Sequence, residues 1–153
     1  MNKEVAINVI NKSKYGLPQY KTDGSSGMDL YANIDKPVWI WPLQVRKIPT
    51  GIMIELVDDI EVEVRSRSGL STNHGIVVVN APGTVDTDYR GEIHAPLINL
   101  SWKPFKILQG MRVAQMVASR YVKIKWCETD ALSDTDRGKS GFGATGLIDH
   151  VKV

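Results

Sequence analysis

The residues with the clearest chemical potential lie in NAPGTVDTDYRGEI, the stretch from Asn80 to Ile93. Its flanks, GIVVVN and GEIHAPL, are strand-like, so the stretch is predicted to be the connection of a hairpin. Asp88 is an ordinary turn residue. Asp86 shares the loop with the aromatic Tyr89, and a carboxylate that faces a cleft can polarise a water as a general base. Because most loop aspartates are merely solvated, both interpretations stay open on these residues alone.

A second group, Arg67, Ser68 and Gly69, follows the alternating strand pattern IEVEV. At the end of a strand, a guanidinium, a hydroxyl and a backbone N–H can converge on one phosphate. The same residues fit equally well an ordinary helix start, in which Ser68 caps a short helix over SGLSTNHG and Gly75 ends it.

Two further polar residues stand in strand-like surroundings, Asp29 in SSGMDLYAN and Gln115 in GMRVAQMV. An aspartate close to glycine is commonly a turn residue. A buried glutamine must satisfy both ends of its amide, and the backbone is its simplest partner.

The stretch RGKSGFGATG, from Arg137 to Gly146, half-matches two phosphate motifs. A Walker loop requires glycine where Ser133 stands, and the dinucleotide fingerprint requires a following helix and strand, for which residues 147–153 are too few. A glycine-rich backbone can still wrap an anion, and the Arg137 guanidinium suits phosphate. A polar tail is the alternative, although the aromatic Phe142 favours a segment that docks on something.

Composition restricts the possible functions. The chain has 153 residues, 42% of them hydrophobic, which predicts one domain with a sizeable core. A net charge of +2 disfavours broad binding to nucleic acid or membranes. Three scattered histidines and a single cysteine, Cys127, give no metal-ligand spacing and no disulfide. No apolar leader or long apolar run is visible, so a soluble, cytoplasmic protein is expected.

The elements that must position these residues are predicted to be short strands. Alternating or β-branched runs such as IEVEVRSR, GIMIEL, FKIL and RVAQMVASRYVKIKW are separated by glycine and proline, which is typical of a sandwich, jelly roll or barrel. Pro96 inside a strand-like run predicts an edge strand or a bulge. The four tryptophans are interpreted as packing residues. From Thr129 the pattern becomes a polar, mobile tail, which would gain a docking place in an oligomer.

In order, residue type and spacing, SGMDLYA, RSRSGLS, NAPGTVDTDYRGEI, GMRVAQMV and RGKSGFGATG resemble the five motifs of the trimeric dUTP pyrophosphatase (dUTPase) family. The resemblance extends from about Leu17 to Gly146. It implies an all-β, jelly-roll-like barrel over residues 1–128 that forms a homotrimer. It further implies a flexible C-terminal arm, residues 129–153, that closes over a neighbouring active site. Two departures are Met28, where many members carry Tyr or Phe, and Ala144, where Ser is common.

The resemblance also implies a reaction, in which dUTP is hydrolysed to dUMP and pyrophosphate with Mg²⁺. Asp86 would activate the attacking water, Tyr89 would lie under the sugar, and Asp29 would contact the metal indirectly, through water. Phe142 would cover the uracil. The remaining implied contacts to the substrate come from three groups. The uracil hairpin contributes Asn80, Gly83, Thr84 and Val85; the phosphate-binding motifs contribute Arg67, Ser68, Gly69 and Gln115; and the arm contributes Arg137, Gly143, Ala144 and Thr145.

Two other functions are conceivable for this sequence. A dCTP deaminase resembles this fold, but the hairpin carries Asp86 and Tyr89 in the pyrophosphatase pattern. A binding or signalling module that needs no turnover is disfavoured because no inserted segment interrupts the five motifs.

Overall fold

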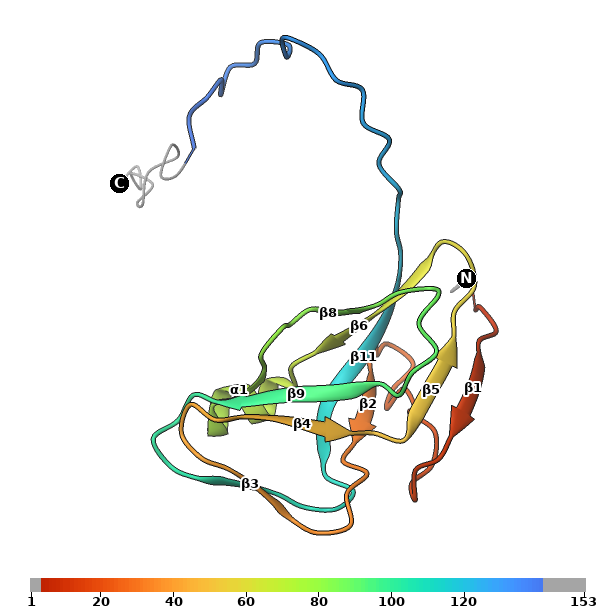
Figure 1. Cartoon of the computed structure of the whole chain (residues 1–153), viewed down its shortest axis with the longest axis vertical. Helices are drawn as coiled ribbons and strands as arrows, with labels where there is room; N and C mark the ends of the chain where they lie inside the picture. The colour runs from red at the N-terminus through yellow and green to blue at the C-terminus, as the bar shows by residue number, and fades with distance from the viewer. Residues whose placement is uncertain (1–3, 142–153) are drawn as a thin grey trace. The chain divides into compact units, whose positions relative to one another are not determined.

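The computed structural model describes residues 4–141 as a mostly β protein with one short helix. The all-β prediction is therefore confirmed. The chain divides into one unit over Met1–Val122 and a second over Lys123–Val153. The elements of the first unit are β1 (Asn8–Asn11), β2 (Met28–Tyr31), β3 (Val38–Ile40), β4 (Val45–Pro49), β5 (Ile52–Glu55), β6 (Ile60–Arg65), α1 (Ser68–His74), β7 (Ile76–Val78), β8 (Gly83–Val85), β9 (His94–Asn99), β10 (Phe105–Ile107) and β11 (Arg112–Arg120) (Figure 1).

Two larger sheets and two strand pairs make up the first unit. One sheet has the order β2-β11-β6-β8, the other the order β4-β9-β7, and the pairs are β1-β5 and β10-β3. All of the pairings are antiparallel. The pattern in β6 is typical of an antiparallel sheet: Ile60, Val62 and Val64 are buried while the residues between them are not, so one face of the strand packs on the core. The largest fully buried apolar side chains are Leu30, Ile40, Ile48, Ile76, Leu97, Ile107 and Val113.

The connection between β7 and β9 contains a strand that the hairpin interpretation missed. β7 pairs with β9, as expected for a hairpin, but β8 within the connection pairs with β6 of the other sheet. Three residues, Gly83 to Val85, are too few to give a clear alternating pattern. This connection, residues 79–93, is called the β8 excursion. It links the two larger sheets and positions the residues that follow β8.

The prediction of a short helix over SGLSTNHG is confirmed in part. α1 ends at Gly75, which is in the left-handed conformation with φ 67°. The predicted cap was wrong: the N-cap position is Arg67, which makes no side-chain capping bond, and Ser68 is already helical. The hydroxyl of Ser71 instead donates to the backbone carbonyls of Arg67 and Ser68.

The prediction for Pro96 was also wrong, because β9 is the central strand of its sheet and pairs with β4 without a register shift. The carbonyl of Pro96 accepts a bond from the N–H of Val79 at 2.8 Å, on the β7 side. Since the N and C=O of one strand residue point to the same side, the missing N–H faces the end of β7. The ladder with β4 therefore loses no bond.

Two expectations about apolar residues differ from the structure. β11 ends at Arg120, opposite the first residue of β6, although the strand-like pattern continues to Trp126. A ladder cannot continue where its partner strand has not begun, and Val122, Ile124 and Trp126 are exposed. The tryptophans are not part of the core of the described chain: Trp39, Trp41, Trp102 and Trp126 are all exposed, Trp102 by 90%.

Candidate active site

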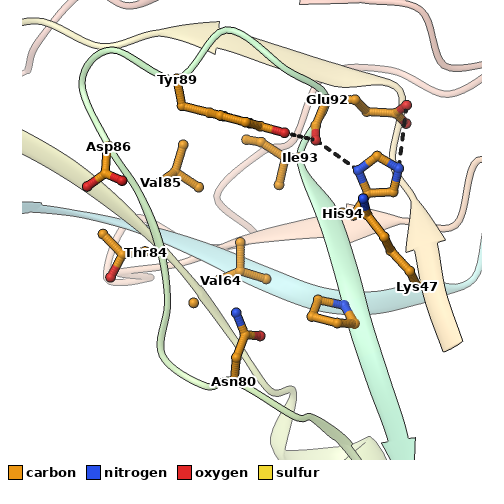
Figure 2. A pocket seen from close by; sticks show the side chains of 12 residues that line it. Lys47, Val64, Asn80, Thr84, Val85, Asp86, Tyr89, Glu92, Ile93 and His94 are labelled. Atoms are coloured by element: carbon orange, nitrogen blue, oxygen red, sulfur yellow. Dashed lines mark hydrogen bonds and ion pairs between the residues drawn. The ribbon is translucent and has the colours of Figure 1, made fainter. Parts of the chain in front are cut away.

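A cavity of about 230 Å³ lies between the β8 excursion and the start of β9. In Figure 2, Thr84 and Asp86 lie at the left of the group, His94 lies at the right, Tyr89 at the top and Asn80 at the bottom. Its lining residues are Lys47, Val64, Asn80, Gly83, Thr84, Val85, Asp86, Tyr89, Glu92, Ile93, His94 and Pro96. The structure thus brings together the whole predicted hairpin group. The volume is below the ~300–1,000 Å³ usual for drug-sized ligands, so the cavity could enclose only part of a ligand as large as a nucleotide.

Strand alternation decides which hairpin side chains face outward. Gly83 and Val85 are buried and Thr84 is exposed, so Asp86, the next residue, leaves the ladder as an exposed carboxylate. A side chain at Gly83 would place a Cβ 2.9 Å from the amide nitrogen of Asn80. Glycine at this position therefore lets the Asn80 amide lie against the backbone at the cavity.

Tyr89 is held by its own loop. Its backbone N–H donates to the carbonyl of Asp86 at 3.2 Å, and its hydroxyl donates to the carbonyl of Glu92 at 3.0 Å. The first bond closes a turn that places Asp86 and Tyr89 at the same cavity.

A second cluster of predicted residues gathers where β2, β11 and the end of β6 meet. The Nε of Arg67 donates to one carboxylate oxygen of Asp29 at 2.8 Å, and Nη1 of Arg112 donates to the other at 2.9 Å. The Asp29 side chain is only 13% exposed. Arg67 also donates from Nη1 to the carbonyl of Arg112 at 3.0 Å. Asp29 therefore fixes both guanidinium groups in place.

Gln115 lies in the same region, since it pairs with Asp29 on one side and with Arg65 on the other. Its amide nitrogen donates to the carbonyl of Ser66 at 2.9 Å, which is the backbone partner considered from the sequence. Gln115 thus supports the chain immediately before Arg67. Its amide oxygen lies 2.6 Å from where a Cβ on Gly27 would stand, so a larger residue there would force the Gln115 side chain to move.

The other predicted phosphate contacts are exposed. Ser68 and Gly69 form the first turn of α1, where backbone N–H groups have no partner within the helix. Arg137 is exposed, and its Nε donates to the carbonyl of Ser140 at 3.0 Å. The predicted contacts of Phe142, Gly143, Ala144 and Thr145 lie outside the described residues.

The cavity lining and the predicted phosphate-binding residues do not overlap within residues 4–141. The cavity lining includes the hairpin residues but, within residues 4–141, none of Arg67, Ser68, Gly69 and Gln115. Over the same residues, no three His, Cys, Asp or Glu side chains form a metal-binding group. No helix of the described chain is long and apolar enough to cross a membrane.

Several site residues were not identified from the sequence. Arg112 stands in the GMRVAQMV stretch, but its partner Asp29 is 83 residues away. Lys47 lines the cavity from β4, His94 from the start of β9, and Glu92 from the loop just before β9. His94 carried no signal because the histidines have no ligand spacing, and no pattern in the sequence marks Glu92.

The fold and the cavity define a class of protein: a small, mostly β domain with a cavity that is lined by Asn80, Asp86 and Tyr89. The chain belongs to the dUTPase family, whose model matches residues 13–146.

Full-length relatives and solved structures agree with the family. The chain is 47% identical over 144 residues to the deoxyuridine 5'-triphosphate nucleotidohydrolase of Rickettsia felis, covering 94% of this chain and 97% of the relative. It is 48% identical, with the same coverage, to that of Rickettsia prowazekii. The fold is similar to the dUTPase of Staphylococcus bacteriophage 80alpha solved with dUPNHPP, with TM-score 0.83 and 20% identity over 93% of this chain and 99% of the other. It is also similar, with TM-score 0.74 and 16% identity over 83% and 98%, to a phage phi11 dUTPase mutant described with a coordinated structural Mg(II) ion.

Proposed function

We propose that this protein hydrolyses dUTP to dUMP and pyrophosphate. The observation that carries the proposal is the hairpin cavity, in which Asn80, Asp86 and Tyr89 meet in a chain about half identical to dUTP nucleotidohydrolases. The reaction removes a nucleotide that a polymerase would otherwise incorporate as uracil, and it supplies dUMP for thymidylate synthesis.

The base end of the substrate belongs to the hairpin. Asn80 and the backbone of Gly83, Thr84 and Val85 would pair with the uracil edge. A cytosine amino group would then face a donor, and a thymine methyl group would face the wall of the cavity. Each buried polar group left unpaired costs about 1–3 kcal/mol, which is enough for selection. Tyr89 would lie under the sugar, where a ribose 2′-hydroxyl would clash.

Asp86 supplies the base for the reaction. Its exposed carboxylate would orient a water toward the α-phosphorus and accept a proton from it as the P–O bond to the leaving pyrophosphate breaks. Tyr89 lies at the same cavity, so the sugar and the attacking water would be positioned by one loop.

The phosphates belong to the second cluster and the arm. The bonds of Arg67 to Asp29 and to the Arg112 carbonyl use two of the five N–H donors of its guanidinium. The remaining donors, with Ser68, the Gly69 N–H and Gln115, would bind the triphosphate. Arg137 would contact the γ-phosphate, while Phe142 would cover the uracil and Gly143, Ala144 and Thr145 would wrap the phosphates.

Mg²⁺ fits this arrangement when it arrives with the substrate. Both oxygens of Asp29 already accept from guanidinium groups, and residues 4–141 form no three-ligand group, so the protein supplies no cage. Mg²⁺ usually keeps several waters and takes phosphate oxygens as ligands. Each carboxylate oxygen of Asp29 has a second lone pair that can accept from a metal-bound water. The bound ion would neutralise charge on the phosphates.

A homotrimer with shared sites would unite these parts. The cavity lining and the guanidinium cluster share no residue. One subunit would supply the hairpin, another the phosphate-binding residues and the third an arm beginning near Thr129. Val122, Ile124 and Trp126 are exposed apolar side chains, and association would remove such surface from water.

Pyrophosphate release measured with dUTP, dTTP, dCTP and UTP tests the function. Rapid release from dUTP alone is expected. Ammonia production from dCTP would instead indicate a deaminase, and the absence of dUTP turnover would reject the proposal.

A further inference from the structure

Glu92 and Ile93, the two residues just before β9, are hydrogen-bonded to the turn between β4 and β5 and to the first residue of β5. The N–H of Ile93 donates to the carbonyl of Ile52 at 2.8 Å. The Thr50 hydroxyl donates to the carbonyl of Ile93 at 2.6 Å, and Thr50 is only 1% exposed. The side chain of Glu92 accepts the N–H of Gly51 at 2.6 Å. These bonds give residues 92–93 a fixed place at the cavity.

The backbone carbonyl of Glu92 is shared between two side chains. It accepts from the hydroxyl of Tyr89 at 3.0 Å and from Nδ1 of His94 at 2.8 Å, as the dashed lines in Figure 2 show. A carbonyl oxygen has two lone pairs, so both bonds can form together. The bond from His94 fixes the orientation of the peptide, and the second lone pair is then held toward Tyr89.

The ring of Tyr89 is folded back over its own loop. A Cβ at Gly91 would lie against the Tyr89 hydroxyl and 2.6 Å from Cζ, so any larger residue at position 91 would force the ring to shift. Tyr89 is nevertheless 44% exposed, so little packing holds the ring from the solvent side. Its position depends on the space at Gly91 and on the bond to Glu92.

We propose that Glu92, His94 and Gly91 are positioning residues that set selectivity for a 2′-deoxy sugar by holding Tyr89 in place. The inference rests on the proposed function, because it concerns the sugar that lies against Tyr89. With the hydroxyl anchored, the ring forms a fixed wall that excludes a ribose 2′-hydroxyl. Without the anchor, the ring can move aside and admit it.

The test compares kcat/KM for dUTP with kcat/KM for UTP. Tyr89→Ala gives the largest loss of this ratio that the wall can cause. Tyr89→Phe and His94→Ala should each lower the ratio about threefold to tenfold, the usual effect of one neutral hydrogen bond. Because both act through the same carbonyl, the double variant should lose no more than the larger single loss. His94→Asn, which keeps a donor near the position of Nδ1, should restore the ratio.

A matched control is His74→Ala, which removes an exposed histidine that contacts Phe105, away from the cavity. Its ratio should equal that of the unmodified protein. Thermal unfolding of each variant separates positioning from folding, since loss of folded protein lowers both activities by one factor and leaves the ratio unchanged. An unchanged ratio in Tyr89→Phe and His94→Ala, with normal dUTP turnover in the parent protein, would overturn this inference alone. A parent protein inactive on dUTP would overturn the proposed function.

Discussion

Asp86 and Asp29 are two carboxylates that the fold holds in opposite ways. Asp86 follows β8 as an exposed side chain at a cavity, and within residues 4–141 no partner for its carboxylate is found. Asp29 is 13% exposed, and each of its oxygens accepts from a different guanidinium. The difference shows how one residue type takes two roles: the carboxylate at the cavity can accept a proton, whereas the paired one fixes the direction of positive charge.

The largest effect is expected for Asp86→Asn, which should lower turnover of dUTP about 10²–10⁴-fold because an amide cannot accept the proton of the attacking water. Pyrophosphate release measures turnover, and calorimetry with a non-hydrolysable dUTP analogue measures binding, which should persist. Asp88→Asn changes the other carboxylate of the loop and should remain close to normal. A parallel loss of binding in Asp86→Asn would remove its role as the base.

Removal of residues 138–153 should lower turnover about 10²-fold, because the triphosphate would lose the groups that order it for attack. Size-exclusion chromatography with light scattering should show that the trimer is retained. A chain lacking only residues 147–153 keeps the RGKSGFGATG stretch and serves as the control, with nearly normal turnover. Full activity of the chain that lacks residues 138–153 would show that the hairpin cavity and the guanidinium cluster act without the arm.

Arg67→Ala should raise the KM for dUTP about tenfold to a hundredfold, the usual effect of losing a charge-assisted hydrogen bond. Arg65→Ala is a matched control, since its guanidinium pairs with Glu63 in the same strand instead of with Asp29. Steady-state kinetics should separate the two variants. Equal effects would mean that general positive charge, and not the geometry set by Asp29, binds the phosphates.

The smallest effect is expected at the exposed pair of Lys14 and Asp35, whose nitrogen and oxygen lie 2.6 Å apart. The hydrogen bond and the charge of Lys14 lower the pKa of Asp35 below its ordinary value. The pair therefore stabilises the fold above the ordinary pKa of aspartate, and this contribution is lost as the pH falls through the lowered pKa. Because both side chains are exposed, Asp35→Asn should leave Tm at neutral pH unchanged in physiological salt. A clear drop in Tm would contradict this prediction, because it would show that the exposed pair contributes measurably to the stability of the fold.

The hairpin cavity was the part of the site that could be predicted most fully. Asn80 to Tyr89 lie within ten residues, so a local loop brings them together. The neighbours Glu92 and His94 could not be identified, because their importance depends on which way β9 presents its first residues and on a bond to Gly51. The ion pair of Asp29 and Arg112 depends on the register of β2 against β11, which no local pattern reports.

The same distinction separates the correct and incorrect predictions for the fold. Alternating patterns identified the strands, and Gly75 ended the helix as predicted, because both depend on neighbouring residues. Pro96 in a central strand, β8 within a loop and the early end of β11 depend on where partner strands begin and end.

By itself, the sequence determined the all-β class, the order of the five motifs and the residues able to do chemistry, since these depend on residue type and short spacing. Only the tertiary structure decided that Asp86 is an exposed side chain and Asp29 a paired one, that Tyr89 is anchored to Glu92, and which residues line the cavity. The physical reason is that strand pairing joins residues far apart in the chain, and burial and charge pairing follow from that joining.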